Sequence, residues 1–205
     1  EIMRLLFMGV QGSGKGTQAK IISSNFEIPH ISTGDLLRGV KGELKAEVDS
    51  YSSVGKLVPD ELMLKVLQTR LGLIDCKNGF ILDGYPRNIK QAKKLDGITK
   101  IDKVIEIQIS DSEALVRAIY RESCSKCGEG YNTKTNPPKR AGICDKCRAN
   151  LTKRADDNEG AMLKRIEIYH NETEPILTHY KSIKINGQQS IEEVTKDILM
   201  ALKKF

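Results

Sequence analysis

A glycine-rich segment near the amino end of the sequence has the residue types that bind phosphate. It reads Gly9-Val10-Gln11-Gly12-Ser13-Gly14-Lys15-Gly16-Thr17. Glycines let the backbone approach phosphate oxygens closely, and the N–H groups at the start of a following helix attract an anion. The ammonium group of Lys15 adds a positive charge. An apolar run precedes the segment and a helical pattern follows it, so the segment is predicted to be a phosphate-binding loop.

Four cysteines form a second group of potential ligands, Cys124-x-x-Cys127 and Cys144-x-x-Cys147, with sixteen residues between the pairs. This spacing is typical of a four-cysteine zinc site. Four thiolates fill a tetrahedral coordination shell, which indicates a structural metal and not a catalytic one. Two disulfides or four free thiols are the alternatives, and Fe²⁺ or Co²⁺ could take the place of Zn²⁺.

The fifth cysteine and the histidines show no such pattern. Cys76 is expected to be a small structural residue near the end of a helix. His30, His170 and His179 lack metal-ligand spacing to one another. They are expected to be structural or exposed, and we assign them no chemistry.

Short apolar runs alternate with helical patterns along the chain, which predicts an α/β fold. The runs are apolar on both faces, as the strands of a buried parallel sheet are. We expect strands at Arg4–Met8, Pro29–Ser32, Phe80–Asp83, Val104–Ile109 and Ser182–Ile185. We expect helices at Lys15–Asn25, Leu36–Val54, Asp60–Leu73, Lys90–Leu95, Ser112–Glu122, Asn158–Tyr180 and Ser190–Lys203.

Two segments interrupt this alternation. Ser123–Asn150 has no periodic apolar stripe and contains the cysteine quartet, so we predict a small inserted domain. Thr33–Val58 has a helical pattern but makes a longer excursion than a simple crossover needs. We predict a second insert there.

Composition narrows the function further. The sequence has 33 Lys and Arg against 27 Asp and Glu, a formal charge of +6, which suits an anionic substrate. It has no tryptophan and 5% aromatic residues, which argues against stacking platforms for single-stranded nucleic acid. No apolar run approaches the length of a membrane span or of a secretory signal, so we expect a soluble cytoplasmic protein.

Several motifs occur in the order that adenylate kinases of the nucleoside monophosphate kinase family show. They are the Lys15-Gly16-Thr17 variant of the phosphate loop, His30-Ile31-Ser32-Thr33-Gly34-Asp35-Leu36-Leu37-Arg38, Gly55-Lys56-Leu57-Val58, Phe80-Ile81-Leu82-Asp83-Gly84-Tyr85-Pro86-Arg87, and Arg154 with Asp156-Asp157. The strict loop pattern places Ser or Thr directly after the lysine, whereas here Gly16 intervenes. The chain resembles this family over nearly its whole length.

The resemblance implies a fold and a reaction. The fold is a P-loop NTPase-type α/β core, a five-stranded parallel sheet with helices on both faces, formed by residues 1–31, 59–120 and 158–205. Residues 32–58 would form a helical monophosphate-binding insert, and residues 121–157 a small zinc-stapled lid. The reaction would be Mg²⁺-dependent phosphoryl transfer, ATP + AMP ⇌ 2 ADP, with structural Zn²⁺ in the lid. Its partners would be ATP, AMP and ADP, with no nucleic acid and no membrane, and the protein would be a monomer.

The resemblance also implies residue roles. The residues expected at the reacting phosphates are Lys15, Asp83, Arg87, Arg121, Arg154 and Arg165, with Asp83 orienting the water shell of Mg²⁺. The expected ATP site comprises Gly12, Ser13, Gly14, Lys15, Gly16, Thr17, Arg117, Arg121, Gly130, Tyr131 and Gln189. The expected AMP site comprises Thr33, Arg38, Lys56, Leu57, Val58, Gly84, Tyr85, Pro86, Arg87, Gln91, Arg154 and Arg165. Thr33 and Gln91 would read the base, and the four cysteines would hold the metal.

Two other functions fit parts of the sequence. The donor could be GTP, or the acceptor UMP or CMP, although the Gln91 amide favours AMP because it can pair with a donor and an acceptor on adenine. From a different class, a zinc-ribbon nucleic-acid binder would use the basic segment 134–140. Such binding would weaken steeply with salt.

Overall fold

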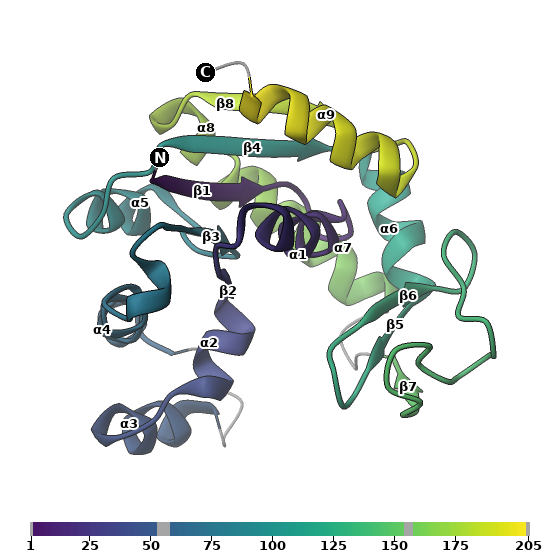
Figure 1. Cartoon of the computed structure of the whole chain (residues 1–205), viewed down its shortest axis with the longest axis horizontal. Coiled ribbons are helices and arrows are strands. Elements are labelled where there is room, and N and C mark those ends of the chain that lie inside the picture. Colours follow the sequence, from purple (N-terminus) through teal and green to yellow (C-terminus); the bar gives the residue numbers. More distant parts are fainter. Residues whose placement is uncertain (1, 53–57, 154–157, 204–205) are drawn as a thin grey trace.

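The five predicted strands form one parallel sheet. The computed structural model describes residues 2–52, 58–153 and 158–203. The sheet has the order β2-β3-β1-β4-β8 (Figure 1). Its strands are β1 (Met3–Met8), β2 (His30–Ser32), β3 (Gly79–Asp83), β4 (Lys103–Gln108) and β8 (Ser182–Asn186). The predicted fold class is therefore confirmed.

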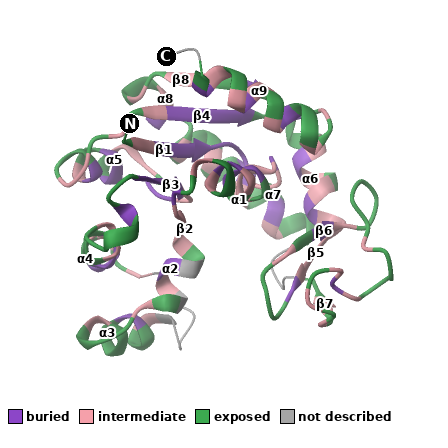
Figure 2. Ribbon diagram, viewed as in Figure 1, coloured by how far each residue is buried: buried purple, intermediate pink, exposed green. Residues whose placement is uncertain are grey.

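Helices bury both faces of this sheet, which explains why its central strands are largely apolar. Along β1, Leu6 and Met8 belong to one buried cluster, and Leu5 and Phe7 belong to the other. Helices α4 (Asp60–Leu71), α5 (Ile89–Asp96) and α8 (Ile176–His179) cover the first face. Helices α1 (Lys15–Phe26) and α9 (Ile191–Lys203) cover the second. The central strands are accordingly buried along most of their length in Figure 2.

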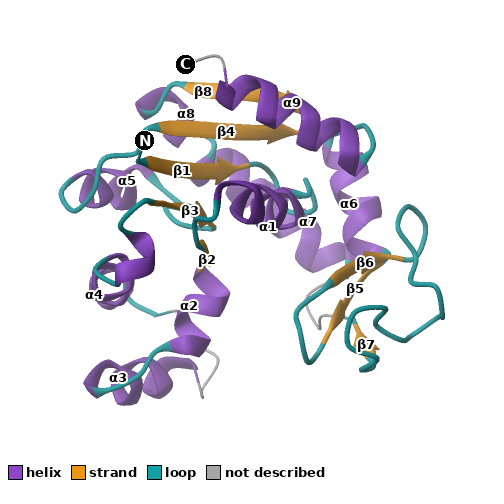
Figure 3. Cartoon of the chain, viewed as in Figure 1, coloured by secondary structure: helices purple, strands orange, loops and turns teal. Residues whose placement is uncertain are grey.

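Three predicted helices end or break differently in the structure (Figure 3). The predicted Leu36–Val54 helix is two helices, α2 (Thr33–Gly39) and α3 (Glu43–Ser52), because Gly42 adopts a φ of 71° that no helix interior accepts. The predicted Ser112–Glu122 helix is α6 (Asp111–Ile119), and its last predicted residues lie in a strand instead.

The predicted Asn158–Tyr180 helix was wrong as one uninterrupted element. It consists of α7 (Glu159–Ile168), a single π-helical turn η2 (Tyr169–Thr173) and α8. The π turn carries His170, whose ring nitrogens lie 2.7 Å from Glu174 Oε2 and 2.9 Å from Asp111 Oδ1. His170 thus joins this turn to the start of α6, and it is exposed and structural as predicted. A short 3₁₀ turn, η1 (Ile74–Cys76), contains Cys76, which is buried.

A small antiparallel sheet lies outside the main one. It contains β5 (Arg121–Cys124), β6 (Gly130–Asn132) and β7 (Leu151–Thr152) in the order β6-β5-β7. Its buried side chains are Cys124, Tyr131 and Cys144. This sheet and the α2–α3 segment project from the same side of the main sheet (Figure 1).

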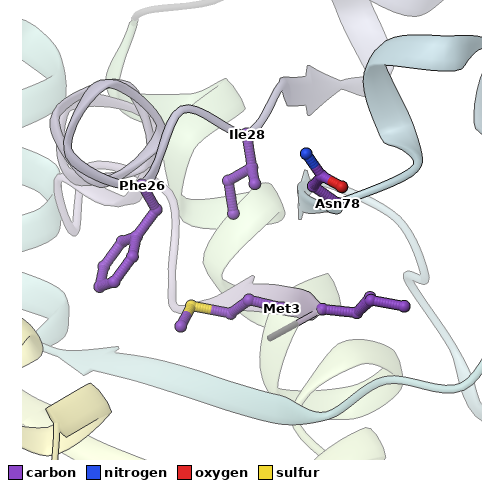
Figure 4. Close-up of a pocket in the computed structure, with 5 residues that line it drawn as sticks. Met3, Phe26, Ile28 and Asn78 are labelled. Carbon is purple, nitrogen blue, oxygen red and sulfur yellow. The ribbon is translucent and has the colours of Figure 1, made fainter.

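A pocket opens at the amino-terminal end of the central strand. Its lining residues are Ile2, Met3, Phe26, Ile28 and Asn78 (Figure 4). Met3 begins β1, whereas the glycine-rich loop follows the other end of that strand. The pocket therefore lies away from the predicted phosphate site. None of the helices in the described ranges combines the length and the apolar composition of a membrane span.

Candidate active site

The glycine-rich loop connects β1 to α1 and packs tightly against neighbouring backbone. Gly12 has a φ of 91°, and a Cβ added there would lie 2.8 Å from the carbonyl oxygen of Ala114 on α6. Gly14 has a φ of 92° and precedes the first residue of α1. The Ser13 hydroxyl is 2% exposed and has no hydrogen-bond partner within the described ranges. These features suit a loop whose N–H and O–H groups can donate hydrogen bonds to an anion.

Asp83 lies at the carboxyl end of β3, beside this loop. Its Oδ2 lies 3.3 Å from His30 Nε2 on the neighbouring strand β2. A Cβ on Gly16 would lie 3.4 Å from the same oxygen, an ordinary van der Waals distance, so the residue that departs from the strict loop pattern lies directly beside this carboxylate. Burial alone would raise the pKa of Asp83, but the hydrogen bond with His30 and the charge of Lys15 outweigh it and lower that pKa. Asp83 is therefore ionised at neutral pH.

Lys15 and three arginine side chains interact electrostatically beside the loop. Burial lowers the pKa of the Lys15 ammonium; the charge of Asp83 raises it, and the positive charges of Arg121, Arg87 and Arg165 lower it further. Burial and the charge of Arg165 likewise lower the pKa of Arg87. These side chains come from α1, β5, the loop after β3, and α7. Cations that repel one another around a phosphate loop form a site for a highly charged anion.

The predicted monophosphate residues gather around Gly84. Arg87 Nε donates to Gly84 O at 2.9 Å, and Thr33 Oγ1 lies 3.4 Å from Arg87 Nη2. A Cβ on Gly84 would lie 2.7 Å from Thr33 Oγ1, so only glycine fits there. Tyr85 and Pro86 are buried beside them. Tyr85 belongs to the buried cluster on the first face of the main sheet, and Val58 packs against that cluster.

Gln91 lies on the first turn of α5 and is 8% exposed. Its Nε2 donates to Asp60 Oδ1 at 2.7 Å, and its Oε1 accepts from the Arg87 backbone N–H at 2.7 Å. The hydroxyl of Tyr85 is near Asp60, and burial together with the Asp60 and Glu61 charges raises the pKa of Tyr85 to about 12. Gln91, which is predicted to read the base, is thus held by Asp60, a residue for which the sequence predicted no role in the site.

The predicted ATP residues outside the loop lie near the α6–lid junction and the loop after β8. Arg117 Nε donates to Glu113 Oε1 at 2.6 Å, and its Nη2 donates to Gly187 O at 2.9 Å. Gln189, two residues further on, donates to Asp197 at 2.6 Å. Gly130 begins β6 and is exposed. Tyr131 is buried inside the small sheet, where its hydroxyl accepts from the Asp145 N–H at 2.9 Å.

The four cysteines meet in the predicted lid. Their sulfur atoms all lie within 4.8 Å of one another. Cys124 and Cys147 are 3.3 Å apart, Cys127 and Cys144 are 3.6 Å apart, and all are free thiols. A disulfide needs about 2.05 Å, so the alternative of two disulfides was wrong, whereas sulfurs around a tetrahedral zinc stand about 3.8 Å apart.

Backbone groups prepare this cluster for a cation. The N–H groups of Lys126 and Cys127 approach Cys124 Sγ at 3.4 and 3.5 Å. Burial would raise the pKa of Cys144, but hydrogen bonds from the Tyr131 hydroxyl and from backbone N–H groups lower it to about 6. A thiolate stabilised in this way is the form that binds metal. The cluster can therefore hold one tetrahedral metal ion.

Comparison with known proteins decides which family has this arrangement. The family model described as adenylate kinase matches residues 7–185. The chain belongs to the adenylate kinase family. An adenylate kinase of Caldicellulosiruptor saccharolyticus is 45% identical over 98% of this chain and 99% of its own length. Those of Clostridioides difficile and Methanocella arvoryzae are 43% and 42% identical over 98% of this chain, and over 98% and 99% of their own lengths.

Family membership confirms the resemblance, while the roles of single residues stay predictions. Arg154, Lys56 and Leu57 lie outside the described residues, as do the acids Asp156 and Asp157. Arg38 lies on α2, but its side chain is not among those that the structure describes. The buried position of Tyr131 gives it a structural part in the lid, and its predicted contact with ATP is not tested by this placement.

Sequence reasoning missed the partners that hold the site residues in place. His30 is partly buried against Asp83, and Asp60 holds Gln91. The first pairing could have been found only from the adjacency of β2 and β3, because 53 positions separate the two residues. At Asp60 the sequence predicted only the first residue of a helix. The helix does begin at Asp60, and the carboxylate also accepts the hydrogen bond from Gln91.

The loop glycines offer a test of the tight packing. Gly12→Ala is expected to lower the free energy of unfolding by about 1–3 kcal/mol more than Gly14→Ala does, because both glycines have positive φ but only Gly12 faces backbone within 3 Å. A Cβ on Gly14 would meet nothing within 4 Å. Urea denaturation of both variants measures the difference. Equal losses would contradict the packing assigned to Gly12.

Proposed function

We propose that the protein catalyses reversible Mg²⁺-dependent phosphoryl transfer, ATP + AMP ⇌ 2 ADP, and so balances the adenine nucleotides. The observation that carries this proposal is that Arg87, Arg121 and Arg165 act electrostatically on Lys15 of the glycine loop, which lies beside the ionised Asp83. Phosphoryl transfer spreads negative charge over the transferred group, and catalysis consists of positioning the reactants and neutralising that charge. No covalent bond to the enzyme is required.

The donor and acceptor would bind on opposite sides of this charge cluster. The loop residues 12–17 and Lys15 would hold the phosphates of ATP, with Arg117, Gly130, Tyr131 and Gln189 on its nucleoside side. Arg38 and Arg87 would hold the phosphate of AMP, with Thr33, Gln91, Gly84–Pro86 and residues 56–58 around its nucleoside. Arg121, Arg154 and Arg165 would contact the phosphate being transferred.

The ionised Asp83 fits a role toward magnesium. Mg²⁺ keeps several waters and is held largely by substrate phosphates, so one carboxylate beside the loop suffices to orient its water shell. When bound, the ion neutralises charge on the phosphates. His30 holds the carboxylate in place for this task.

The cysteine cluster would hold a structural Zn²⁺. The small sheet of the lid buries few apolar side chains, so metal binding would supply much of its folding free energy. The proposed division is a core of residues 1–31, 59–120 and 158–205, a monophosphate-binding insert of residues 32–58, and a lid of residues 121–157. We propose that the protein acts as a monomer.

ADP formation from Mg·ATP tests the proposal, with AMP, GMP, CMP and UMP offered separately and a control without acceptor. Rapid ADP formation with AMP and little with the others is the expected result. Turnover with a pyrimidine acceptor in place of AMP would contradict the acceptor assigned here. A rate that does not depend on any acceptor would contradict phosphoryl transfer between nucleotides.

A further inference from the structure

The Gln91 amide has an unusual pair of neighbours for a base-reading group. Its two polar atoms are each bonded within the protein, to Asp60 Oδ1 and to the Arg87 N–H, both at 2.7 Å. A carboxylate can only accept a hydrogen bond, and a backbone N–H can only donate one. Turning the amide over would set two oxygens against each other and two N–H groups against each other. The two neighbours therefore permit only one of the two amide orientations.

We infer that Asp60 is a positioning residue that makes the monophosphate pocket select adenine over 6-oxopurines. This inference rests on the proposed function, in which Gln91 reads the acceptor base. Among the described residues, the amide in its fixed orientation keeps one N–H on Nε2 and one lone pair on Oε1 without a partner. Adenine presents the complementary pair, an acceptor at N1 and a donor at its 6-amino group.

Hypoxanthine and guanine present the reverse pair. Each has an acceptor at O6 and a donor at N1–H, which only the turned-over amide could match. Because Asp60 and the Arg87 N–H block that orientation, IMP or GMP would leave buried polar groups facing like groups. A site built to pair with one pattern rejects the reversed pattern strongly, since unpaired buried groups lose their hydration without compensation.

The surroundings keep both partners in place. Asn88 caps α5 by accepting from the Gln91 N–H at 2.9 Å, which fixes the backbone of the base-reading residue. Asp60 is the first residue of α4, where its charge complements the helix dipole. Asp60, which accepts the hydrogen bond from the amide, is therefore as well positioned as Gln91, which donates it.

Initial rates with AMP and with IMP as acceptors test the inference. Asp60→Ala is expected to reduce the ratio of kcat/KM for AMP to that for IMP by about tenfold or more, the discrimination that one paired amide contact provides. The change is expected in KM for AMP and IMP, with KM for ATP unchanged. Asp60→Asn retains an oxygen of the same shape that can accept from Gln91, and is expected to keep most of the ratio.

Two controls separate positioning from a general effect. Glu61→Ala removes the adjacent, more exposed acid from the same helix turn, and is expected to leave the ratio unchanged. In a Gln91→Ala background, Asp60→Ala is expected to change the ratio no further, because both substitutions act through one amide. An unchanged ratio in Asp60→Ala, or an equal loss with and without Gln91, would overturn the inference.

The two proposals fail in different ways. Wild-type protein that does not phosphorylate AMP would overturn the proposed function and this inference together. Wild-type protein that phosphorylates AMP, with a ratio that is the same in Asp60→Ala, overturns the inference alone. If Asp60→Ala does not fold, as judged by circular dichroism, Asp60→Leu in the same assay decides the question.

Discussion

Replacing Lys15 by alanine is expected to lower kcat/KM for ADP formation by about 10³-fold, because the variant loses a charge placed where negative charge develops. Arg87→Ala is expected to have an effect of similar size through the acceptor phosphate. Burial lowers the pKa of Lys15 and the charge of Asp83 only partly offsets it, which means that the Lys15 charge is unfavourable in the folded protein. The melting temperature of Lys15→Ala should therefore not fall below that of the wild type.

The matched control for this experiment is Lys196→Ala on α9, an exposed lysine outside the charge cluster. It is expected to retain wild-type kcat/KM. Initial-rate kinetics and thermal melting of the three proteins separate a lost catalytic charge from a damaged fold. A Lys15→Ala enzyme within threefold of the wild-type rate would show that the loop binds phosphate without this ammonium group.

Cys144→Ser is expected to remove the metal ion from the lid. Cys144 is completely buried, and hydrogen bonds from Tyr131 and from backbone N–H groups lower its pKa to about 6, which favours the thiolate at neutral pH. Loss of one of four ligands should weaken Zn²⁺ binding by at least about 100-fold, more than loss of an outer partner does. Because metal binding is proposed to supply much of the folding free energy of the small sheet, the melting temperature should fall as well. Elemental analysis after dialysis against a chelator measures the bound metal.

Cys76→Ser provides the matched control, since Cys76 is a buried thiol outside the cluster. It is expected to retain about one metal ion per chain, as the wild type does. Retention of the same metal content by Cys144→Ser would refute a four-thiolate site. A wild-type protein that binds no Zn²⁺ when refolded with it would do the same.

The main sheet was predictable because buried parallel strands are continuously apolar. Leu5 to Met8 read as one apolar run, and the structure divides them between the two faces. Breaks in helices were harder to predict. Gly42 gave a local signal for the break between α2 and α3, whereas the π turn at His170 depends on contacts with Asp111, 59 positions away.

Local sequence patterns also predicted the phosphate loop and the cysteine cluster, because the residues of each are close in sequence. The roles of the arginines were implied by the family resemblance and not by any spacing. Contacts between distant segments were not predictable at all, as the pairs His30–Asp83 and Asp60–Gln91 show. The first pair depends on the order of the strands in the sheet, and the second on the packing of α4 against α5. Candidate site residues are therefore easier to predict from the sequence than the residues that position them.

The crowding of Lys15 by three arginines has a consequence for how the stability of the protein is measured. Burial and these like charges lower the pKa of Lys15, so an anion bound beside them is expected to stabilise the folded chain. Any polyanion that binds only the folded chain adds about 2.7 kcal/mol at 100 times its dissociation constant. Phosphate, pyrophosphate or residual nucleotide from purification would each shift the unfolding transition upward. Melting curves recorded in phosphate buffer and in an uncharged buffer thus describe two different ligation states of the same protein.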